Sequence, residues 1–143
     1  MNPARKFQLR FLGRINYLKI VRDFVREVLE PRKLDVITVH TVVSSVDEAL
    51  ANVITHAYEG DPAGEVTIQI QLDDDSLGIS IRHGGKGFDP SKIPEPDMKK
   101  YAAQGKKGGL GLQFMRQFMD EVTYRVGDDG INEWRLRKRL PVV

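Results

Sequence analysis

A pair of alternating stretches near the middle of the chain constrains the fold more than any other feature. Apolar side chains take every second position, first at Val66, Ile68, Ile70 and Leu72 and then at Leu77, Ile79 and Ile81. The polar residues 73–76 between the two stretches are typical of a turn. This pattern predicts an antiparallel hairpin with one buried face and one solvated face. The rest of the chain must therefore supply a layer that covers the buried face.

Two helical patterns precede the hairpin and can supply that layer. Apolar residues recur at three- and four-residue steps from Ile15 to Leu29, and Pro31 ends this pattern. A second pattern begins at about Leu34 and carries a broad apolar stripe through Ala57. Many residues of the stripe are β-branched, so burial rather than intrinsic helix propensity must stabilise this helix.

The ends of the chain add strands and one more helix. The spacing predicts a strand over 7–12, a helix over 110–119 and two closing strands over 121–126 and 132–140. The element order indicates an α/β protein of the α+β kind. We expect a single domain over residues 1–143, built as a two-layer sandwich in which one mostly antiparallel mixed sheet carries its helices on one face.

Composition excludes several classes of function. The chain has 143 residues, no cysteine, three scattered histidines and a formal net charge of +2. It therefore has neither disulfides nor thiolate sites, and the histidine spacing does not suit zinc. It contains no apolar run long enough for a membrane span and no signal-peptide pattern. We expect a cytoplasmic protein that binds neither membranes nor, because its basic excess is small, nucleic acid.

A polar row lies beside the apolar stripe of the second helix. Glu48, Asn52 and His56 are spaced four apart, so on an α-helix they share one face at the edge of the core. One interpretation is a solvated surface row. The other is functional, since a carboxylate one turn before an amide can orient a hydroxyl nucleophile and hold a magnesium ion.

Two glycine-rich segments follow this helix. Residues 82–90 read Arg-His-Gly-Gly-Lys-Gly-Phe-Asp-Pro directly after a strand, and residues 105–112 read Gly-Lys-Lys-Gly-Gly-Leu-Gly-Leu at the start of a helix. Glycines permit positive φ angles and the close approach of another group. Before a helix they also expose N–H groups that suit phosphate oxygens. Either segment alone is also compatible with an ordinary flexible turn.

The order of these three segments is more informative than any one of them. A helix containing "VDEALANVITHAY", a strand followed by "GKGFDP" and a helix opened by "GGLGLQFMRQFMDEVTY" together resemble the GHKL ATPase superfamily. Within it they are most similar to the bacterial anti-sigma factor serine-protein kinases. The resemblance covers about residues 9–140 and implies the Bergerat-type, histidine-kinase-like ATPase fold.

The resemblance also implies roles for particular residues. Glu48 is implied as the catalytic carboxylate that accepts the proton of a serine hydroxyl. Asn52 is implied as the ligand of the Mg²⁺ that bridges the phosphates of ATP, and residues 105–111 as a lid over those phosphates. The remaining residues implied at the ATP site are His56, His83, Gly85, Gly87, Phe88, Lys107, Gly108, Gly109, Leu110, Gly111, Leu112 and Asn132.

Two positions depart from the family pattern. The first glycine box of the family reads Asp-x-Gly-x-Gly, and its aspartate accepts a hydrogen bond from the amino group of adenine. Aligning Gly85 and Gly87 with this box places His83 at the aspartate position, and Asn132 stands where the family commonly has threonine. A neutral imidazole accepts through one nitrogen and an imidazolium through none. We therefore expect His83 to weaken or relax adenine recognition.

The implied function is that of an ATP- and Mg²⁺-dependent serine-protein kinase that acts as an anti-sigma factor. Its implied partners are a sigma factor and a small anti-anti-sigma protein phosphorylated on serine, and the resemblance also allows a homodimer. One alternative is a non-catalytic partner-switching module of the same fold, which His83 and Asn132 favour. The other is a histidine kinase catalytic domain, which the absence of a dimerisation helix pair and a phospho-acceptor region in the sequence disfavours.

Overall fold

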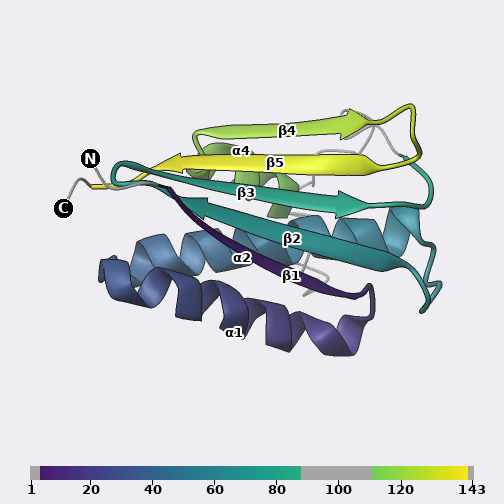
Figure 1. Ribbon diagram of the computed structural model, residues 1–143, viewed down its shortest axis with the longest axis horizontal. Coiled ribbons are helices and arrows are strands. Elements are labelled where there is room, and N and C mark those ends of the chain that lie inside the picture. The colour runs from purple at the N-terminus through teal and green to yellow at the C-terminus, as the bar shows by residue number, and fades with distance from the viewer. Residues whose placement is uncertain (1–3, 88–110, 142–143) are drawn as a thin grey trace, which may run out of the picture.

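The strands and helices form two layers (Figure 1). The computed structural model describes residues 4–87 and 111–141, with the side chains of the last helix described from Met115 onward. The strands are β1 (Arg5–Leu12), β2 (Glu65–Leu72), β3 (Ser76–His83), β4 (Glu121–Val126) and β5 (Asn132–Arg139), and the helices are α1 (Leu18–Leu29), α2 (Val36–Asn52) and α4 (Gly111–Phe118).

The five strands form one sheet in the order β1-β2-β3-β5-β4. The expected α+β sandwich is confirmed, but every pairing among the described strands is antiparallel, so the expected mixed sheet has no parallel pair there. Strand β1 lies beside β2, with Phe7 opposite Ile70, although α1 and α2 separate the two strands in sequence. The two helices return the chain to the end of the sheet at which β1 finished, so β2 runs back along β1.

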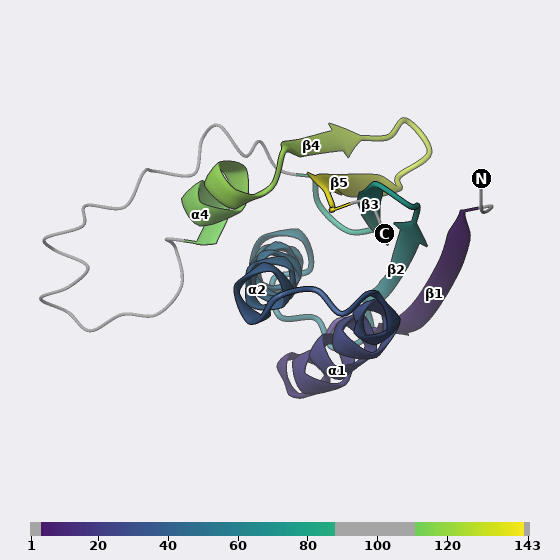
Figure 2. The same ribbon diagram turned by 90° about the vertical axis from the view of Figure 1, so that its left-hand side faces the viewer.

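The three helices lie on the same side of the sheet (Figure 2). The expected alternation is observed, since Ile68, Ile70, Ile79 and Ile81 are all buried. Against them α1 and α2 place their own buried residues, among them Val21, Val25, Val42, Val46, Leu50 and Val53. Because a single face of the sheet is covered by helices, the opposite face carries polar and charged side chains.

Helix α2 begins and ends differently from the expectation. The side chain of Asp35 caps the helix by accepting a hydrogen bond from the backbone N–H of Thr38, at 2.7 Å, so the helix begins at Val36. After Asn52 the backbone changes to a π-helical turn, Val53–Ala57. Since π-helical hydrogen bonds join residues five apart, the expected single α-helical face does not continue to His56.

The remaining boundaries are close to those expected. Helix α1 ends at Leu29, and Pro31 lies in the 3-10 turn Glu30–Arg32 that follows it. Strand β1 begins at Arg5 and β5 ends at Arg139, each within two residues of its expected boundary. None of the helices within 4–87 and 111–141 is both long and apolar enough to cross a membrane.

Candidate functional site

The polar pair of α2 lies at the buried edge of the helix. Asn52 is 8% exposed, and its Nδ2 atom has no hydrogen-bond partner among the described residues. Glu48 lies one turn earlier and is half-buried. Buried polar groups are nearly always hydrogen-bonded, so an amide held here without a partner is suited to a ligand. The side chain of Asn52 offers both an oxygen and N–H groups, which fits a metal ion bound together with phosphate oxygens.

The other expected phosphate-side residues are distributed differently. His56 lies in the π-helical turn and its side chain is exposed, so its environment differs from that of Asn52. Gly111 and Leu112 form the start of α4. Five expected residues lie outside the described part of the chain: Phe88, Lys107, Gly108, Gly109 and Leu110.

The structure brings His83 and Asn132 together. His83 ends β3, Asn132 begins β5, and the two residues are directly opposite in the antiparallel register. Each is 2% exposed. The two positions at which the sequence departs from the family pattern are therefore cross-strand neighbours in one buried site.

Both nitrogens of His83 are engaged. Nδ1 lies 2.7 Å from the carbonyl oxygen of Gly84, and Nε2 lies 3.1 Å from the hydroxyl of Tyr124. A carbonyl can only accept, so Nδ1 carries the proton, and in the neutral ring Nε2 accepts from Tyr124. Burial lowers the pKa of His83, while the hydrogen bond to Gly84 opposes that shift. The imidazole is therefore neutral near pH 7.

Tyr58 fixes the glycine loop that follows β3. Its hydroxyl accepts a hydrogen bond from the backbone N–H of Gly84, at 2.7 Å, and donates one to the carbonyl oxygen of Glu65, at 2.5 Å. The backbone N–H of Lys86 also donates to the carbonyl of Ala57, at 2.9 Å. These bonds hold the loop against the end of the helical segment that carries Asn52.

Packing explains why two positions of this loop are glycine. Gly85 has a φ angle of +72°, and a Cβ atom there would lie 2.7 Å from both the carbonyl oxygen of Ala57 and the ring of Tyr58. At Gly87 a Cβ atom would lie 2.9 Å from Val126 and 3.4 Å from the Oδ1 atom of Asn132. The close neighbours of both glycines are thus protein groups, and Gly87 lies directly beside Asn132.

Sequence reasoning missed Tyr58 and Tyr124. Both end stretches that resemble the family, but the sequence pattern assigns neither of them a role, and only the fold shows that Tyr58 contacts the glycine loop and Tyr124 contacts His83. Side chains alternate along β4, and the register of β4 with β5 places Tyr124 opposite the buried Trp134. Tyr124 therefore faces inward.

The charged cluster on the open face of the sheet is separate from this site. Glu133 is 3% exposed, and its Oε2 accepts hydrogen bonds from Ser80, at 2.8 Å, and from Arg82, at 2.7 Å, while Oε1 accepts from Arg135. Burial raises the pKa of Glu133, but these hydrogen bonds outweigh burial and lower it to about 2. Because strand side chains alternate, Glu133 points away from the face that carries Asn132.

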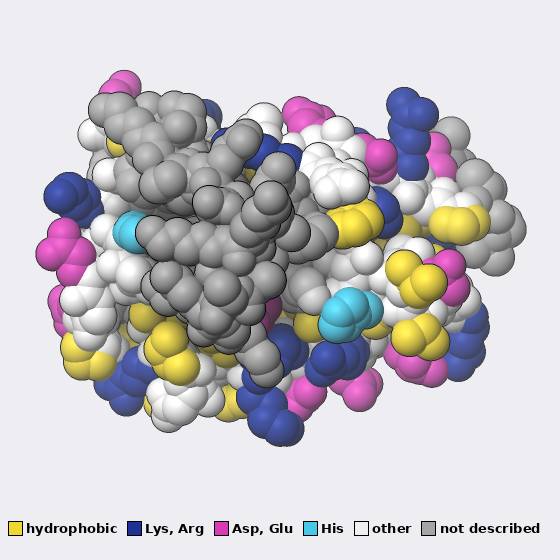
Figure 3. Space-filling view, turned by 180° about the vertical axis from the view of Figure 1, so that it is seen from behind, with side chains coloured by type: hydrophobic (Ala, Val, Ile, Leu, Met, Phe, Trp, Pro, Cys, Tyr) yellow, Lys and Arg dark blue, Asp and Glu magenta, His cyan; other side chains and the backbone are white. Residues whose placement is uncertain are grey.

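The helix side of the molecule is mixed in charge. In the described part of the face shown in Figure 3, basic, acidic and hydrophobic side chains are interspersed. The exposed hydrophobic residues of α1 and α2 include Ile20, Val36 and Ile37. Among the described residues, the charges on this face do not single out a nucleic-acid-binding surface.

The chain matches a known family over most of its length. The family described as the histidine kinase-like ATPase domain matches residues 11–138, from the end of β1 to near the end of β5. The chain belongs to the histidine kinase-like ATPase family. The matched range includes the Glu48–Asn52 pair and the His83–Asn132 pair.

Relatives of this ATPase-family chain include proteins named anti-sigma F factor. The one from Heyndrickxia coagulans is 31% identical over 147 aligned positions, which cover 94% of this chain and 92% of the relative. The one from Anoxybacillus flavithermus is 33% identical over 103 residues, which cover 72% of this chain and 68% of the relative.

Solved structures that share the fold include the following two. The crystal structure of the RsbU and RsbW domains of a Mycobacterium tuberculosis protein has a TM-score of 0.67 at 19% identity and covers 98% of this chain and 34% of that one. The crystal structure of the SiaB–SiaC complex from Pseudomonas aeruginosa has a TM-score of 0.56 at 17% identity. That match covers 92% of this chain and 89% of the matched chain. At these identities the likeness shows the fold alone.

Proposed function

We propose that this member of the histidine kinase-like ATPase family is an ATP-dependent serine-protein kinase that acts as an anti-sigma factor. Its proposed partners are a sigma factor and a small anti-anti-sigma protein that it phosphorylates on serine. The observation that carries the proposal is Asn52, a buried amide with an unpartnered nitrogen one turn after Glu48. The anti-sigma F factors among the relatives support the choice of partners.

In this proposal the α2 pair acts at the phosphate end of ATP. Asn52 would hold Mg²⁺ together with phosphate oxygens, and the ion would neutralise charge on the phosphates. The serine hydroxyl oxygen forms a bond to the γ-phosphorus as the bond to the bridging oxygen of ADP breaks, and the hydroxyl proton passes to Glu48. Such a transfer depends on positioning and on charge stabilisation more than on a strong base.

The opposite end of the nucleotide is proposed to lie at His83 and Asn132. Gly85 and Gly87 belong to the same loop, and the hydrogen bonds from Gly84 to Tyr58 and from Lys86 to Ala57 connect it to the end of the π-helical turn that follows α2. Hydrogen bonds thus connect the two segments that carry the proposed ends of the site. By resemblance, the segment that includes Lys107, Gly108 and Gly109 is proposed as the lid.

Phosphoryl transfer tests the proposal directly. The protein is incubated with γ-labelled ATP, Mg²⁺ and a candidate anti-anti-sigma protein, and label on a serine of that protein is measured. Glu48→Gln should lower the transfer rate roughly a hundredfold, because it removes the proton acceptor. Asn52→Ala should abolish the Mg²⁺ dependence of nucleotide affinity in a calorimetric titration.

A matched control lies next to Glu48. Asp47→Asn changes the adjacent carboxylate of the same helix, whose partner is Arg22 of α1 at 2.8 Å, and should keep near-normal transfer. Full activity in Glu48→Gln, or an equal loss in Asp47→Asn, would contradict the role proposed for Glu48.

The second candidate function is a binding module without catalysis. One observation favours it, since the acceptor nitrogen of His83 already receives a hydrogen bond from Tyr124. In the same assay this module would give a stable complex with the partner and no label on it. Label on an aspartate of a response regulator would instead indicate the histidine-kinase alternative.

A further inference from the structure

Four aromatic side chains form a continuous wall at the proposed base position. The His83 ring stacks on Tyr124, with centroids 5.8 Å apart and an interplanar angle of 22°, and meets the edge of Tyr58 at 6.1 Å and 76°. Tyr124 in turn packs at 4.9 Å on Trp134, which is 1% exposed. The wall joins the segment after α2 to β3, β4 and β5.

The hydrogen bonds along this wall have a definite direction. The Tyr124 hydroxyl donates to Nε2 of His83, and Nδ1 of His83 donates to the carbonyl of Gly84. The N–H of Gly84 donates to the Tyr58 hydroxyl, which donates to the carbonyl of Glu65. The direction of the bond between Tyr124 and His83 depends on the His83 tautomer that the Gly84 carbonyl selects, whereas backbone groups fix the directions of the two Tyr58 bonds.

The His83 ring is fixed in this orientation. Turning it would break the bonds to Gly84 and Tyr124 together and would leave buried polar groups without partners, which is unfavourable. The rings of Tyr58 and Tyr124 also contact it. The imidazole therefore cannot offer Nε2 to a ligand while the Tyr124 hydroxyl is in place.

We propose that Tyr124 is a specificity-determining residue of the nucleotide site. Its hydroxyl satisfies the one acceptor that neutral His83 possesses, so the site does not select a purine by its 6-amino group. A 6-amino purine and a 6-oxo purine then bind with similar affinity. This inference rests on the proposed function, because it takes His83 as the base position.

Calorimetric titration of ADP and of inosine diphosphate tests the inference. The two ligands differ in the 6-amino and 6-oxo groups, and their affinity ratio should be close to one for the unmodified protein. Tyr124→Phe keeps the ring and removes the hydroxyl, so that Nε2 of His83 no longer receives the hydrogen bond from Tyr124. ADP affinity should then rise about three- to tenfold relative to inosine diphosphate.

Two further variants test whether a change in the affinity ratio is due to the hydroxyl of Tyr124. Thr123→Val alters the adjacent residue of β4, which is exposed on the other face of the sheet, and should leave the ratio unchanged. His83→Asp supplies a carboxylate, which can accept from Tyr124 and from an amino group together, so the ratio should rise with Tyr124 intact. Thermal unfolding of each variant establishes that it is folded.

The outcomes separate this inference from the proposed function. A strong preference of the unmodified protein for ADP overturns the inference and leaves the kinase proposal standing. A ratio that rises in His83→Asp but not in folded Tyr124→Phe also overturns it. If the two ligands bind the unmodified protein equally and Tyr124→Phe favours ADP, but no serine of a partner is labelled in the transfer assay, the inference is supported and the kinase proposal fails. Absence of binding in all folded variants overturns both.

Discussion

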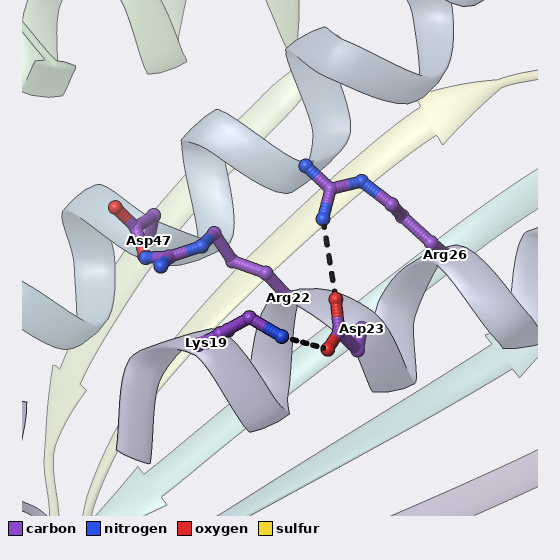
Figure 4. Close-up of polar contacts among 5 residues, drawn as sticks. All are labelled: Lys19, Arg22, Asp23, Arg26 and Asp47. Atoms are coloured by element: carbon purple, nitrogen blue, oxygen red, sulfur yellow. Dashed lines mark hydrogen bonds and ion pairs between the residues drawn. The ribbon is translucent and has the colours of Figure 1, made fainter. Parts of the chain in front are cut away.

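Arg22 of α1 and Asp47 of α2 form an ion pair, with the Nη1 atom of Arg22 2.8 Å from the Oδ1 atom of Asp47 (Figure 4). Asp47 immediately precedes Glu48, so the pair ties the helix that carries the candidate carboxylate to its neighbour. The nearby pairs of Asp23 with Lys19 and Arg26 lie within α1 and make no such link.

Arg22→Ala should lower the free energy of unfolding only slightly. The two side chains are 34% and 37% exposed, so solvent screens their attraction and the expected loss is up to about 1 kcal/mol. Asp47→Ala should give a similar loss, and the double variant should lose little more than either single one. Urea unfolding measures all three. Fully additive losses would show that the two residues do not stabilise the protein through each other.

Gly85→Ala should destabilise the protein, whereas Gly78→Ala should not. Alanine at position 85 must adopt a positive φ angle and places its Cβ 2.7 Å from the carbonyl oxygen of Ala57, which should cost about 1–3 kcal/mol. At Gly78, in the same region of the chain, a Cβ atom meets nothing within 4 Å. Thermal unfolding of the two variants checks this contrast. Equal melting temperatures would mean that the loop relaxes at no cost.

Stability should fall as the pH is lowered through the range in which histidine titrates. Burial lowers the pKa of folded His83, so the unfolded chain binds a proton at a higher pH than the folded protein does. The stabilising effect of neutral His83 is complete above pH 6.5 and is lost as the pH falls from there to its folded pKa. His83→Gln should flatten this part of the stability profile, and an unchanged slope in the folded variant would contradict this account. Melting temperatures between pH 7.5 and 5 measure the slopes.

Glu133→Gln should destabilise the protein more at neutral pH than in acid. Burial raises the pKa of Glu133, but hydrogen bonds from Arg82, Ser80 and Arg135 lower it to about 2. The carboxylate therefore stabilises the fold above its ordinary pKa, and this contribution is lost as the pH falls toward 2. We expect a loss of roughly 1–3 kcal/mol at pH 7 and a smaller one at pH 3. A loss that does not change with pH, measured by urea unfolding, would contradict this account.

The fold could be predicted from the sequence because its signals are local. Alternation in residues 66–81 and the three- and four-residue steps of α1 are direct consequences of burying one face of each element. The π-helical turn after Asn52 could not be predicted this way, because the apolar stripe continues through Ala57 without a break in its pattern. Its position depends on tertiary contacts such as those of Tyr58.

The candidate site was only partly accessible from the sequence. The four-residue spacing predicts that Glu48 and Asn52 share one face of a helix. Aligning the glycine loop with the family pattern indicates that His83 takes the position of the family's aspartate. The direct pairing of His83 with Asn132 follows from the sheet order, which places β5 rather than β4 beside β3. The contact of Tyr124 with His83 follows from the same order, since β4 lies beside β5 and Tyr124 reaches His83 of β3 from there.

The sheet order also determines how the protein opens locally. Among the described strands, β1 is an edge strand that pairs with β2 alone, whereas β3 lies between β2 and β5. Detaching β1 breaks one set of backbone hydrogen bonds, and exposing the amides of β3 requires the centre of the sheet to come apart. Hydrogen exchange should therefore be fast in β1, and in β3 it should be as slow as global unfolding requires. The end of β3 is His83, so we expect the proposed base position to lie on the part of the chain that opens last.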